Sequence, residues 1–429
     1  MLSSAETDLV RRDQSIPGLA TVLDDETFVA RMRRCAPGSS LRTARILFIK
    51  YKPGRSCRVS YRLEVAGEEV DVCVRAYGVE DRDRFLVERE LPAVTGRLGW
   101  GCVALEDCAV LVSVFPNDHK LPALLRLMDD KDRRKLLGEL LPDHAELGSY
   151  SLQCLRYKPE RRYLARLQAA NGTQAAVKWY TEKGYTRGKR HAEAFQSRGP
   201  LRVARPIGWS DHNRAVAFEW LAGSPLMELC AARGIDCRPL TVAGAALAEV
   251  HEQKPAGLVC RSRADEVADL MSLSDALGSL CPYLAVRAEC VARRIAAQLS
   301  GAPAMHDSVH GDFSAKQTLV GPHEVGILDF DTAYYGDSAD DLGNFIAQIE
   351  RYALRGEISS SQAERLRDAL LEGYGLATRR PLPQRIGLYT AIGLLRRTQY
   401  PFQVREPDWP QRTESLLERA EVILNTGRC

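Results

Sequence analysis

One stretch decides how the chain folds: VHGDFSAKQTLVGPHEVGILDFDTAYYGDSADDLGNF, residues 309–345. Two short β-branched or apolar runs, Thr318 to Val320 and Val325 to Phe330, predict β-strands. The sequence GPHE between them contains Gly and Pro and is typical of a turn. We therefore expect a β-hairpin whose turn is centred near His323.

This hairpin brings oxygen-bearing side chains together at its open end. Gln317 and Asp329 lie six residues on either side of the turn centre, so we expect them to face each other with Cα atoms roughly 4.5–5.5 Å apart. Asp312 lies on the loop that enters the first strand, at the same end. Mg²⁺ prefers such oxygen ligands, typically one or two carboxylates together with substrate phosphates. The arrangement predicts phosphoryl transfer, which depends mostly on positioning and charge neutralisation.

The motifs HGDFSAKQ, ILDFD and GDSADDLGNF, in this order, resemble the catalytic and metal-binding loops of the aminoglycoside phosphotransferase/choline kinase family. These small-molecule kinases have a protein-kinase-like fold. The resemblance implies that Asp312 is the catalytic aspartate, that Asp329 binds the metal, and that His310 fixes the loop. Gln317 stands where most members have asparagine, a departure shared with maltokinase-like members. One extra methylene shifts a metal ligand by a sizeable fraction of the precision a site needs.

The remaining acidic residues of the stretch have a structural interpretation. The segment GDSADDL is typical of a turn that leads into a helix N-terminus, where aspartate is a common cap. We interpret four carboxylates in this way: Asp331, Asp337, Asp340 and Asp341.

Composition sets the class of protein. With 429 residues, of which 45% are hydrophobic and 27% charged, the chain is long enough for two or three domains. A net charge of +3 predicts no strong attraction to nucleic acid or to a membrane surface. The opening MLSSAETDLVRRDQ lacks the apolar core of a signal peptide, and no later run approaches membrane-spanning length. We expect a soluble cytoplasmic protein without nucleic-acid or membrane partners.

The twelve cysteines are scattered singly, with no CxxC pair and no zinc pattern. Cys73 and Cys154 lie in strand-like apolar runs. A free thiol in such a run behaves as a small hydrophobic group, so we expect mainly buried, reduced cysteines.

An internal repeat precedes the hairpin. Residues 46–77, beginning ILFIKYKPG, are echoed by residues 152–180, beginning LQCLRYKPE, with Tyr51 and Tyr157 separated by 106 positions. AVLVSVFPNDHKL, from Ala109, is echoed at the same separation by AVAFEWLAGSPL. Each copy predicts three strands, a helix and a further strand pair, which is the order of a kinase-like N-terminal lobe. Two unrelated β-rich segments with a coincidental YKP are the alternative.

In the second copy, family resemblance assigns Lys178, on the third strand, to the α- and β-phosphates. Glu193 in the following helix is then the expected ion-pair partner of this lysine. In the first copy the matching position is Arg75, whose planar guanidinium does not reproduce a lysine point charge. Residues 41–150 are therefore interpreted as a degenerate lobe that serves as a cap or a packing partner.

Two segments are candidates for the rest of the nucleotide site. The turn YKPERR is no glycine-rich phosphate loop, and Lys158, Arg161 and Arg162 are expected either to reach the triphosphate or to form a solvated basic edge. The apolar strand AVAFEWLAGSPL, residues 215–226, matches the hinge of kinase-like folds. In such folds the hinge contacts the adenine ring. The candidates for this contact are therefore Glu219, Trp220 and Leu221.

Helical patterns dominate the remainder, at residues 241–253, 262–299, 360–376 and 387–402. We therefore predict an α+β, bilobal protein-kinase-like fold with a β-rich N-lobe and a helical C-lobe, preceded by a degenerate duplicated N-lobe-like domain. Its parts are an extension (1–40), the degenerate repeat or cap (41–150), the N-lobe with hinge (151–228) and the C-lobe (229–429).

The predicted function is phosphorylation of a hydroxyl group on a small molecule, with the nucleoside triphosphate ATP and Mg²⁺ as cofactors. Aminoglycosides, sugars and amino alcohols are all open as acceptors, because substrate choice depends on the pocket and not on the fold. Two alternatives remain. One is a maltokinase-like sugar kinase; the other is a pseudokinase with a nucleotide-binding or regulatory role.

Overall fold

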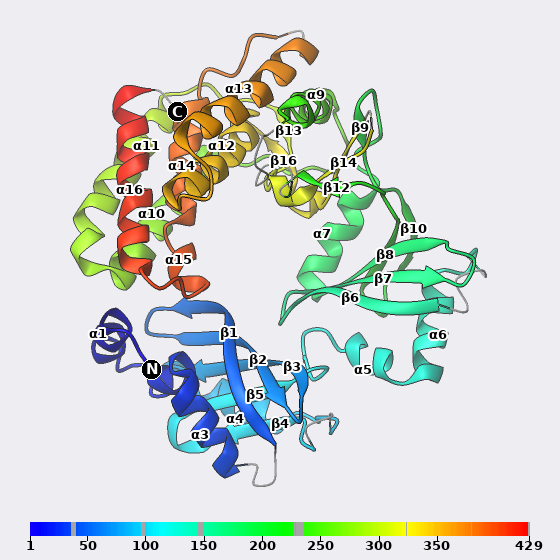
Figure 1. The fold of residues 1–429 in the computed structure, drawn as a ribbon, viewed down its shortest axis with the longest axis vertical. Helices are drawn as coiled ribbons and strands as arrows, with labels where there is room; N and C mark the ends of the chain where they lie inside the picture. The colour runs from blue at the N-terminus through cyan, green and yellow to red at the C-terminus, as the bar shows by residue number, and fades with distance from the viewer. Residues whose placement is uncertain are drawn as a thin grey trace.

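In the computed structural model, the described residues are 1–35, 40–95, 99–144, 150–226, 228, 236–322, 324–378 and 380–427. They form two five-stranded antiparallel sheets and a large helical region, arranged around a common centre (Figure 1). The predicted α+β composition, with β-rich parts first and helices last, is confirmed. The predicted turn centre, His323, lies outside the described residues.

The first sheet follows three helices that occupy most of the predicted extension. These helices are α1 (Ser4–Arg12), α2 (Leu19–Leu23) and α3 (Asp25–Cys35). The sheet has the spatial order β1-β2-β3-β5-β4. Its strands are β1 (Leu41–Lys52), β2 (Ser56–Val65), β3 (Glu68–Tyr77), β4 (Cys102–Leu105) and β5 (Val110–Val114), with α4 (Arg82–Arg89) inserted after β3.

The second sheet is built in the same way. Two helices, α5 (Ala123–Met128) and α6 (Asp130–Leu140), precede it and α7 (Glu182–Ala192) follows its third strand. Its spatial order, β6-β7-β8-β11-β10, repeats that of the first sheet. The strands are β6 (Tyr150–Lys158), β7 (Arg162–Ala169), β8 (Gln174–Tyr180), β10 (Pro206–Ser210) and β11 (Ala215–Glu219).

Strand register places Arg75 in the position of Lys178. Arg75 on β3 pairs with Arg58 on β2, and Lys178 on β8 pairs with Leu164 on β7. Arg58 and Leu164 are separated by the same 106 positions as the two YKP motifs. These two ladders match Arg75 with Lys178, whereas the next ladder, in which Arg75 pairs with Leu111 and Lys178 pairs with Val216, differs from this match by one residue.

The correspondence extends beyond the strands. The Tyr51 hydroxyl donates to Asp13 Oδ2 at 2.6 Å, and the Tyr157 hydroxyl donates to Asp118 Oδ2 at 3.0 Å. Each aspartate stands a few residues before a helix pair: α2 and α3 pack on the first sheet, and α5 and α6 pack on the second. Packing thus groups α5 and α6 with the second sheet, whereas the predicted boundary at residue 150 grouped them with the first.

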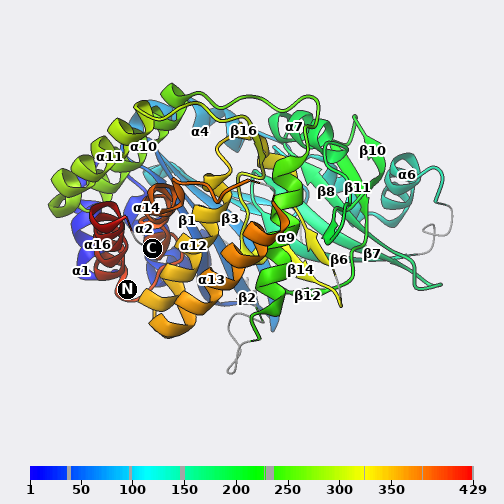
Figure 2. The same ribbon diagram turned by 90° about the horizontal axis from the view of Figure 1, so that it is seen from above.

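The helical region contains the hairpin. Its helices are α9 (Arg238–Glu252), α10 (Arg263–Leu280), α11 (Ala285–Ser300), α12 (Ala339–Leu354), α13 (Ser360–Ala377), α14 (Ile386–Arg397), α15 (Tyr400–Gln403) and α16 (Trp409–Thr426). Two pairs pack most closely, α9 with α13 and α12 with α14 (Figure 2). The short strands are β9 (Leu201–Arg202), β12 (Ser224–Pro225), β13 (Asp307–Val309), β14 (Thr318–Val320), β15 (Val325–Ile327) and β16 (Tyr334–Gly336).

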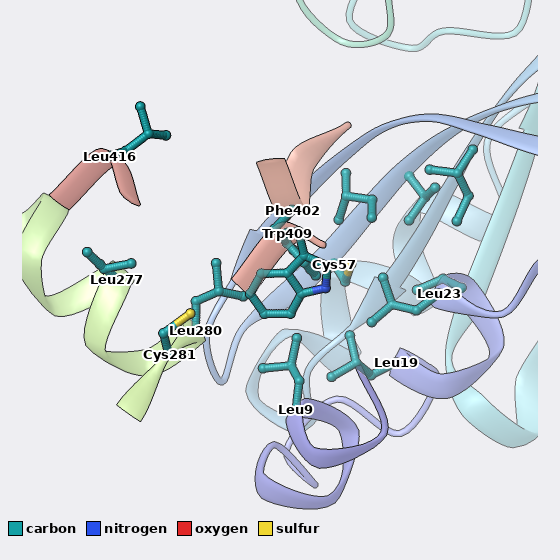
Figure 3. Packing of buried hydrophobic residues seen from close by; sticks show 14 of the residues in the cluster. Leu9, Leu19, Leu23, Cys57, Leu277, Leu280, Cys281, Phe402, Trp409 and Leu416 are labelled. Carbon is teal, nitrogen blue, oxygen red and sulfur yellow. The ribbon is translucent and has the colours of Figure 1, made fainter. Parts of the chain in front are cut away.

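The first sheet and the C-terminal helices share one hydrophobic core. Figure 3 shows Leu9 and Leu19 from the N-terminal helices facing Leu280 and Cys281 of the helical region, with Trp409 between them. Trp409 is only 3% exposed. The N-terminal part is therefore packed against the helical region and is not a loosely tethered addition.

Two predictions from composition are tested. The ten described cysteines are free thiols. Cys73 is buried, as expected; Cys154 is exposed, so the prediction that it is buried is wrong. Within the described ranges, none of the helices combines the length and apolar character needed to cross a bilayer.

Candidate active site

The hairpin exists, with a register one residue away from the predicted one. Thr318 pairs with Ile327 and Val320 with Val325 in an antiparallel ladder. The amide of Leu328 donates to the carbonyl of Gln317 at 2.8 Å. Gln317 therefore lies opposite Leu328, and the prediction that it lies opposite Asp329 is wrong. The second strand also ends earlier than expected, because residues 330–332 form a 3₁₀ turn.

The predicted side chains still meet, because Asp329 leaves the strand conformation. Its φ is +70°, in the left-handed region that non-glycine residues seldom adopt. The Gln317 Nε2 atom lies 3.3 Å from Asp329 Oδ2 and 3.4 Å from Asp312 Oδ2. The two carboxylates and the amide do converge, as expected, and the convergence depends on a backbone conformation of Asp329 that is strained for a non-glycine residue.

The loop that carries Asp312 is held by buried hydrogen bonds. His310 is fully buried; its Nε2 donates to the carbonyl of Leu328 at 2.8 Å, and its Nδ1 accepts from the Asp312 amide at 3.2 Å. Asp341 accepts from the amides of His310 and Gly311 at 2.7 and 2.9 Å. His310 occupies the loop-fixing position expected for it. Asp341, interpreted as a helix cap, instead anchors the loop from α12.

Lys178 joins the hairpin from the second sheet. Its Nζ atom lies 2.9 Å from Asp329 Oδ1 and 3.6 Å from Asp331 Oδ2. Burial opposes the charge of Lys178, but Asp329 and Asp331 outweigh it and raise the lysine pKa. Burial also opposes ionisation of Asp329, yet Lys178 and Arg162 hold the pKa of Asp329 well below its usual range. Asp329 is therefore ionised at neutral pH.

Asp331 belongs to the same group, which corrects its interpretation as a turn residue. It accepts a hydrogen bond from the Tyr180 hydroxyl at 3.2 Å and lies 3.5 Å from Arg162. Burial and the neighbouring Asp329 raise the pKa of Asp331, although Lys178 acts against them. The sequence DFD, residues 329–331, could have indicated that both aspartates belong to the site. They lie on either side of Phe330, which starts the 3₁₀ turn.

Glu193 does not pair with Lys178, which corrects another prediction. Glu193 is exposed and forms the C-terminal cap of α7, because this helix ends at Ala192. The α7 side chain that reaches the hairpin is His191, whose Nδ1 lies 3.1 Å from the carbonyl of Phe330. Among the described residues, Lys178 has ion partners from the hairpin and none from α7.

The basic side chains of the turn between β6 and β7 do not all line the same cavity. Arg162 lies 2.7 Å from Asp329 Oδ2 and lines the same cavity as Lys178. Lys158 lines a neighbouring cavity instead, beside Asp312. Arg161 contributes to the lining of neither cavity. Of the three candidate phosphate contacts, the geometry therefore favours Arg162 over Lys158 and Arg161.

The Lys178 cavity has a volume of about 430 Å³ and is bounded by both sheet and hairpin. The hinge candidates Glu219, Trp220 and Leu221 all line it. Apolar side chains such as Leu319 and Ile327 line it too, together with the charged side chains of the cluster around Asp329. A cavity with apolar and charged side chains suits a planar base joined to phosphates.

A second cavity, of about 460 Å³, contains Asp312. Residues of the loop and hairpin, Lys316 and Gln317, line both cavities, so the two adjoin at the point where the carboxylates meet. This arrangement places the Asp312 carboxylate on the side away from the hinge.

The residues at this point fit a magnesium ion. The described residues contain no group of three or more His, Cys, Asp or Glu side chains that could hold a metal ion by themselves. Mg²⁺ needs no such cage, because it keeps water molecules and substrate phosphates among its ligands. Asp329 supplies a carboxylate and Gln317 an amide, whose nitrogen and oxygen exchange places when the group rotates by half a turn.

Comparison with known protein families gives one match for this chain. A family model described as "Phosphotransferase enzyme family" matches residues 148–383, more than half of the chain. The curated proteins include no significant match.

Solved structures give weak likenesses. A choline/ethanolamine kinase family protein from Mesorhizobium loti is 16% identical, with a TM-score of 0.47, 69% of this chain covered and 95% of that one. Choline kinase LicA from Streptococcus pneumoniae is 14% identical, with a TM-score of 0.46 and coverages of 68% and 99%. For a thermostable mutant of aminoglycoside phosphotransferase APH(4)-Ia the identity is 14%, the TM-score 0.47 and the coverages 66% and 97%.

Proposed function

The chain belongs to the phosphotransferase enzyme family, and from this membership we propose that it is an ATP-dependent kinase that phosphorylates a hydroxyl group of a small molecule. One observation carries the proposal. Asp312, Gln317, Asp329 and Lys178 converge, through contacts of 2.9–3.4 Å, where two cavities adjoin. Phosphoryl transfer needs such a junction, with the nucleotide on one side and the acceptor on the other.

The nucleotide occupies the cavity lined by the hinge. The adenine ring lies along residues 219–221, and the phosphates extend toward Lys178 and Arg162. These two cations are paired with Asp329 and Asp331 in the structure. Triphosphate oxygens offer them a second set of acceptors, and charge-assisted hydrogen bonds of this kind are the strong ones.

In the chemical step, the acceptor hydroxyl oxygen attacks the γ-phosphorus while the bond from that phosphorus to the departing ADP oxygen breaks. Asp312 orients the hydroxyl and accepts its proton. The carboxylate is exposed to the acceptor cavity, and its backbone is held by His310. Asp329 and Gln317 would hold Mg²⁺, which supplies charge neutralisation at the phosphates when bound.

The first sheet is proposed to be a degenerate copy of the N-lobe that has lost nucleotide binding. Support comes from the shared strand order and from the position of Arg75. Arg75 hydrogen-bonds Glu160, a carboxylate from the β6–β7 turn of the second sheet, and lies 3.6 Å from Glu88 on α4. The place where phosphates meet a lysine in the active copy is thus filled by side chains of the chain itself.

The same correspondences suggest how the chain is divided. Residues 13–114 and 118–219 form the two copies when the aspartate and helix pair before each sheet are counted, in place of 41–150 and 151–228. The helical C-lobe follows, and residues 13–114 act as a cap that contacts both lobes.

The test is the variant Asp312→Asn. Turnover, followed as ADP release with a panel of hydroxyl acceptors, is expected to fall about 100- to 10,000-fold, the range for loss of a general base. Nucleotide binding, followed as thermal stabilisation by Mg²⁺ and AMP-PNP, is expected to persist. Asp236→Asn serves as the matched control, because Asp236 is half exposed and paired only with Arg238 among its described neighbours.

Two outcomes would contradict the proposal. Turnover retained by Asp312→Asn would remove the carboxylate from the mechanism. Nucleotide stabilisation without product from any acceptor would favour the pseudokinase alternative.

A further inference from the structure

The cavity that contains Asp312 is strongly basic. Seven of its fourteen lining residues are Arg or Lys, and Asp312 is the one acidic side chain among the described residues that line it. The basic residues come from different elements. They include Arg156 of β6, Lys316 of the catalytic loop, Arg351 of α12 and Arg397 of α14. Charge of one sign therefore surrounds the carboxylate on several sides.

Part of this charge is neutralised within the protein. Arg396 lies 2.7 Å from Asp340 Oδ1, and Arg261 lies 3.7 Å from Asp340 Oδ2. Arg351 lies 3.7 Å from Glu406, a carboxylate that also pairs with Arg355 at 2.7 Å. Arg396 and Arg261 thus have Asp340 as a carboxylate partner, and Arg351 shares Glu406 with Arg355.

Arg397 has no carboxylate partner among the described residues. Its guanidinium donates to neutral oxygens only: Asn344 Oδ1 at 2.9 Å, the Asn344 carbonyl at 3.1 Å and the Gly393 carbonyl at 2.8 Å. Burial, followed by the nearby Arg351, lowers the pKa of Arg397 to about 10, and the charge of Asp312 acts in the opposite direction. Arg397 is therefore a fixed, uncompensated cation within electrostatic range of Asp312.

Three further cations on the cavity wall are unpaired within the described part of the chain: Arg156, Lys158 and Lys316. Lys316 is exposed and lines both cavities. Burial, with Arg156 and Arg162 nearby, lowers the pKa of Lys158 to about 8. A neighbouring anion would relieve this repulsion, because an opposite charge favours the charged form of a lysine.

We propose that the acceptor of this kinase is an anionic hydroxyl compound, whose phosphate or carboxylate group is bound by Arg397 and Lys316 while its hydroxyl meets Asp312. The proposal deepens the proposed function and rests on it. A guanidinium held by several hydrogen bonds suits recognition of planar or tetrahedral oxyanions. A cationic acceptor, such as an aminoglycoside or an amino alcohol, needs carboxylates, which the cavity supplies only as the catalytic Asp312.

The basic residues do not all serve the nucleotide. The nucleotide cavity has two cations that the Asp312 cavity lacks, Arg162 and Lys178, and it shares Arg156 and Lys316 with that cavity. Arg351 and Arg397 belong to helices of the C-lobe. They line the Asp312 cavity and do not line the nucleotide cavity. An anion site beside the nucleotide site is therefore separable by experiment.

The first experiment measures binding by titration calorimetry on the full chain, with AMP-PNP and Mg²⁺ at saturation so that the nucleotide site is filled. Glucose 6-phosphate and inorganic phosphate are the probes, and glucose and kanamycin are the neutral and cationic comparisons. We expect the two anionic probes to bind and glucose and kanamycin to bind at least tenfold more weakly. Equal or tighter binding of glucose or kanamycin would overturn the proposal, as would failure of both anions to bind.

The second experiment repeats the titrations with variants. In Arg397→Gln, loss of one charged hydrogen-bonding partner is expected to weaken phosphate binding about 10- to 100-fold. Lys316→Gln provides the same test at an exposed position, in case the buried substitution prevents folding. Arg293→Gln is the control, because Arg293 is 70% exposed and pairs with Glu289 on the surface of α11. Affinities in both cavity variants equal to that of the control would overturn the proposal.

The two proposals fail in distinguishable ways. If AMP-PNP does not bind, the kinase function is wrong whatever the anions do. If AMP-PNP binds and ADP is released with a neutral or cationic acceptor without advantage for an anionic one, the kinase function stands and the anionic acceptor is wrong. A carboxylate source is separated from a phosphate source by comparing gluconate with glucose 6-phosphate.

Discussion

Glu160 provides the sharpest test of how the two sheets are joined. This residue lies in the β6–β7 turn with a φ of +56°, and its side chain is 7% exposed. Its carboxylate contacts three cations of the preceding parts of the chain: Arg75, Arg58 at 3.3 Å and Lys120 at 2.6 Å. Glu160→Gln keeps the size of the side chain and removes its charge, which leaves these cations facing one another.

The magnitude follows from the pKa of Glu160. Burial opposes ionisation, but Arg75 and Arg58 outweigh it and lower the pKa from 4.5 to about 2. At roughly 1.4 kcal/mol per pKa unit, this corresponds to about 3 kcal/mol of folding free energy at pH 7. Removal of one partner from a buried ion pair costs about 3–5 kcal/mol, which agrees with this value. We therefore expect Glu160→Gln to lower the free energy of unfolding by about 3 kcal/mol.

The pH dependence has a definite sign. A carboxylate whose folded pKa is lowered stabilises the fold above its unfolded pKa, and this contribution disappears as the pH falls from 4.5 toward 2. The difference between wild type and Glu160→Gln is thus expected to shrink from about 3 kcal/mol at pH 7 to about 2 kcal/mol at pH 3.5.

Urea unfolding at several pH values measures this difference. Glu289→Gln, which removes an exposed partner of Arg293 on α11, is the control and should change stability by no more than about 0.5 kcal/mol. A Glu160→Gln effect as small as that of the control would refute the reasoning. A difference that stays constant between pH 7 and pH 3.5 would also refute it, because the effect would then not arise from ionisation.

Three other perturbations test the site. Gln317→Asn keeps an amide at this position, and turnover is expected to stay within about tenfold; Gln317→Leu, which removes the amide, should lower turnover and raise the Mg²⁺ concentration needed for half-maximal ADP release. Asp341→Asn weakens the acceptor for two loop amides and is expected to lower kcat about 10- to 100-fold with little change in the KM for ATP. Phosphate binding should weaken above pH 8 as Lys158 loses its proton, and Lys158→Met should remove this pH dependence in calorimetric titrations.

The sequence was sufficient for the hairpin and for the convergence of its polar side chains. Turn residues and β-branched runs marked both strands, and the structure forms them at Thr318–Val320 and Val325–Ile327. The register was missed by one residue. A turn centred at His323 predicted that Gln317 faces Asp329, but Val320 pairs with Val325, which sets the ladder one residue away from that prediction. Asp329 still reaches Gln317, because its positive φ ends the strand and redirects the carboxylate. A backbone conformation that is strained for aspartate leaves no mark in the pattern of residue types.

Residues that act across long separations were harder to predict. Asp341 follows a helix-capping pattern, and only the tertiary fold brings it to the amides of His310 and Gly311. Glu193 was chosen because it follows the lysine strand at a suitable distance, but α7 ends one residue before it. Lys178 instead finds its counter-charge in Asp329 and Asp331, more than 150 positions away.

The proposed repeat was predicted from its strands, and the structural correspondence between the two sheets extends further. The motif YKP is conspicuous because it recurs unchanged, whereas Asp13 and Asp118 stand in stretches that share few identities. Their common role, accepting the hydroxyl of the YKP tyrosine, becomes visible only with coordinates.

The first sheet and the Asp312 cavity are physically linked. The β6–β7 region carries Arg156 and Lys158 into the Asp312 cavity, and Glu160 in the same turn is bound by the cations of the first sheet. The opposite side of the first sheet shares a core with Phe402 and Trp409 of the C-lobe. The first sheet therefore contacts both the turn that lines this cavity and the C-terminal helical region, whose Arg397 lines it as well. Because unfolding of the cap would release the turn, loss of the Glu160 ion pairs should weaken acceptor binding more than nucleotide binding at the hinge.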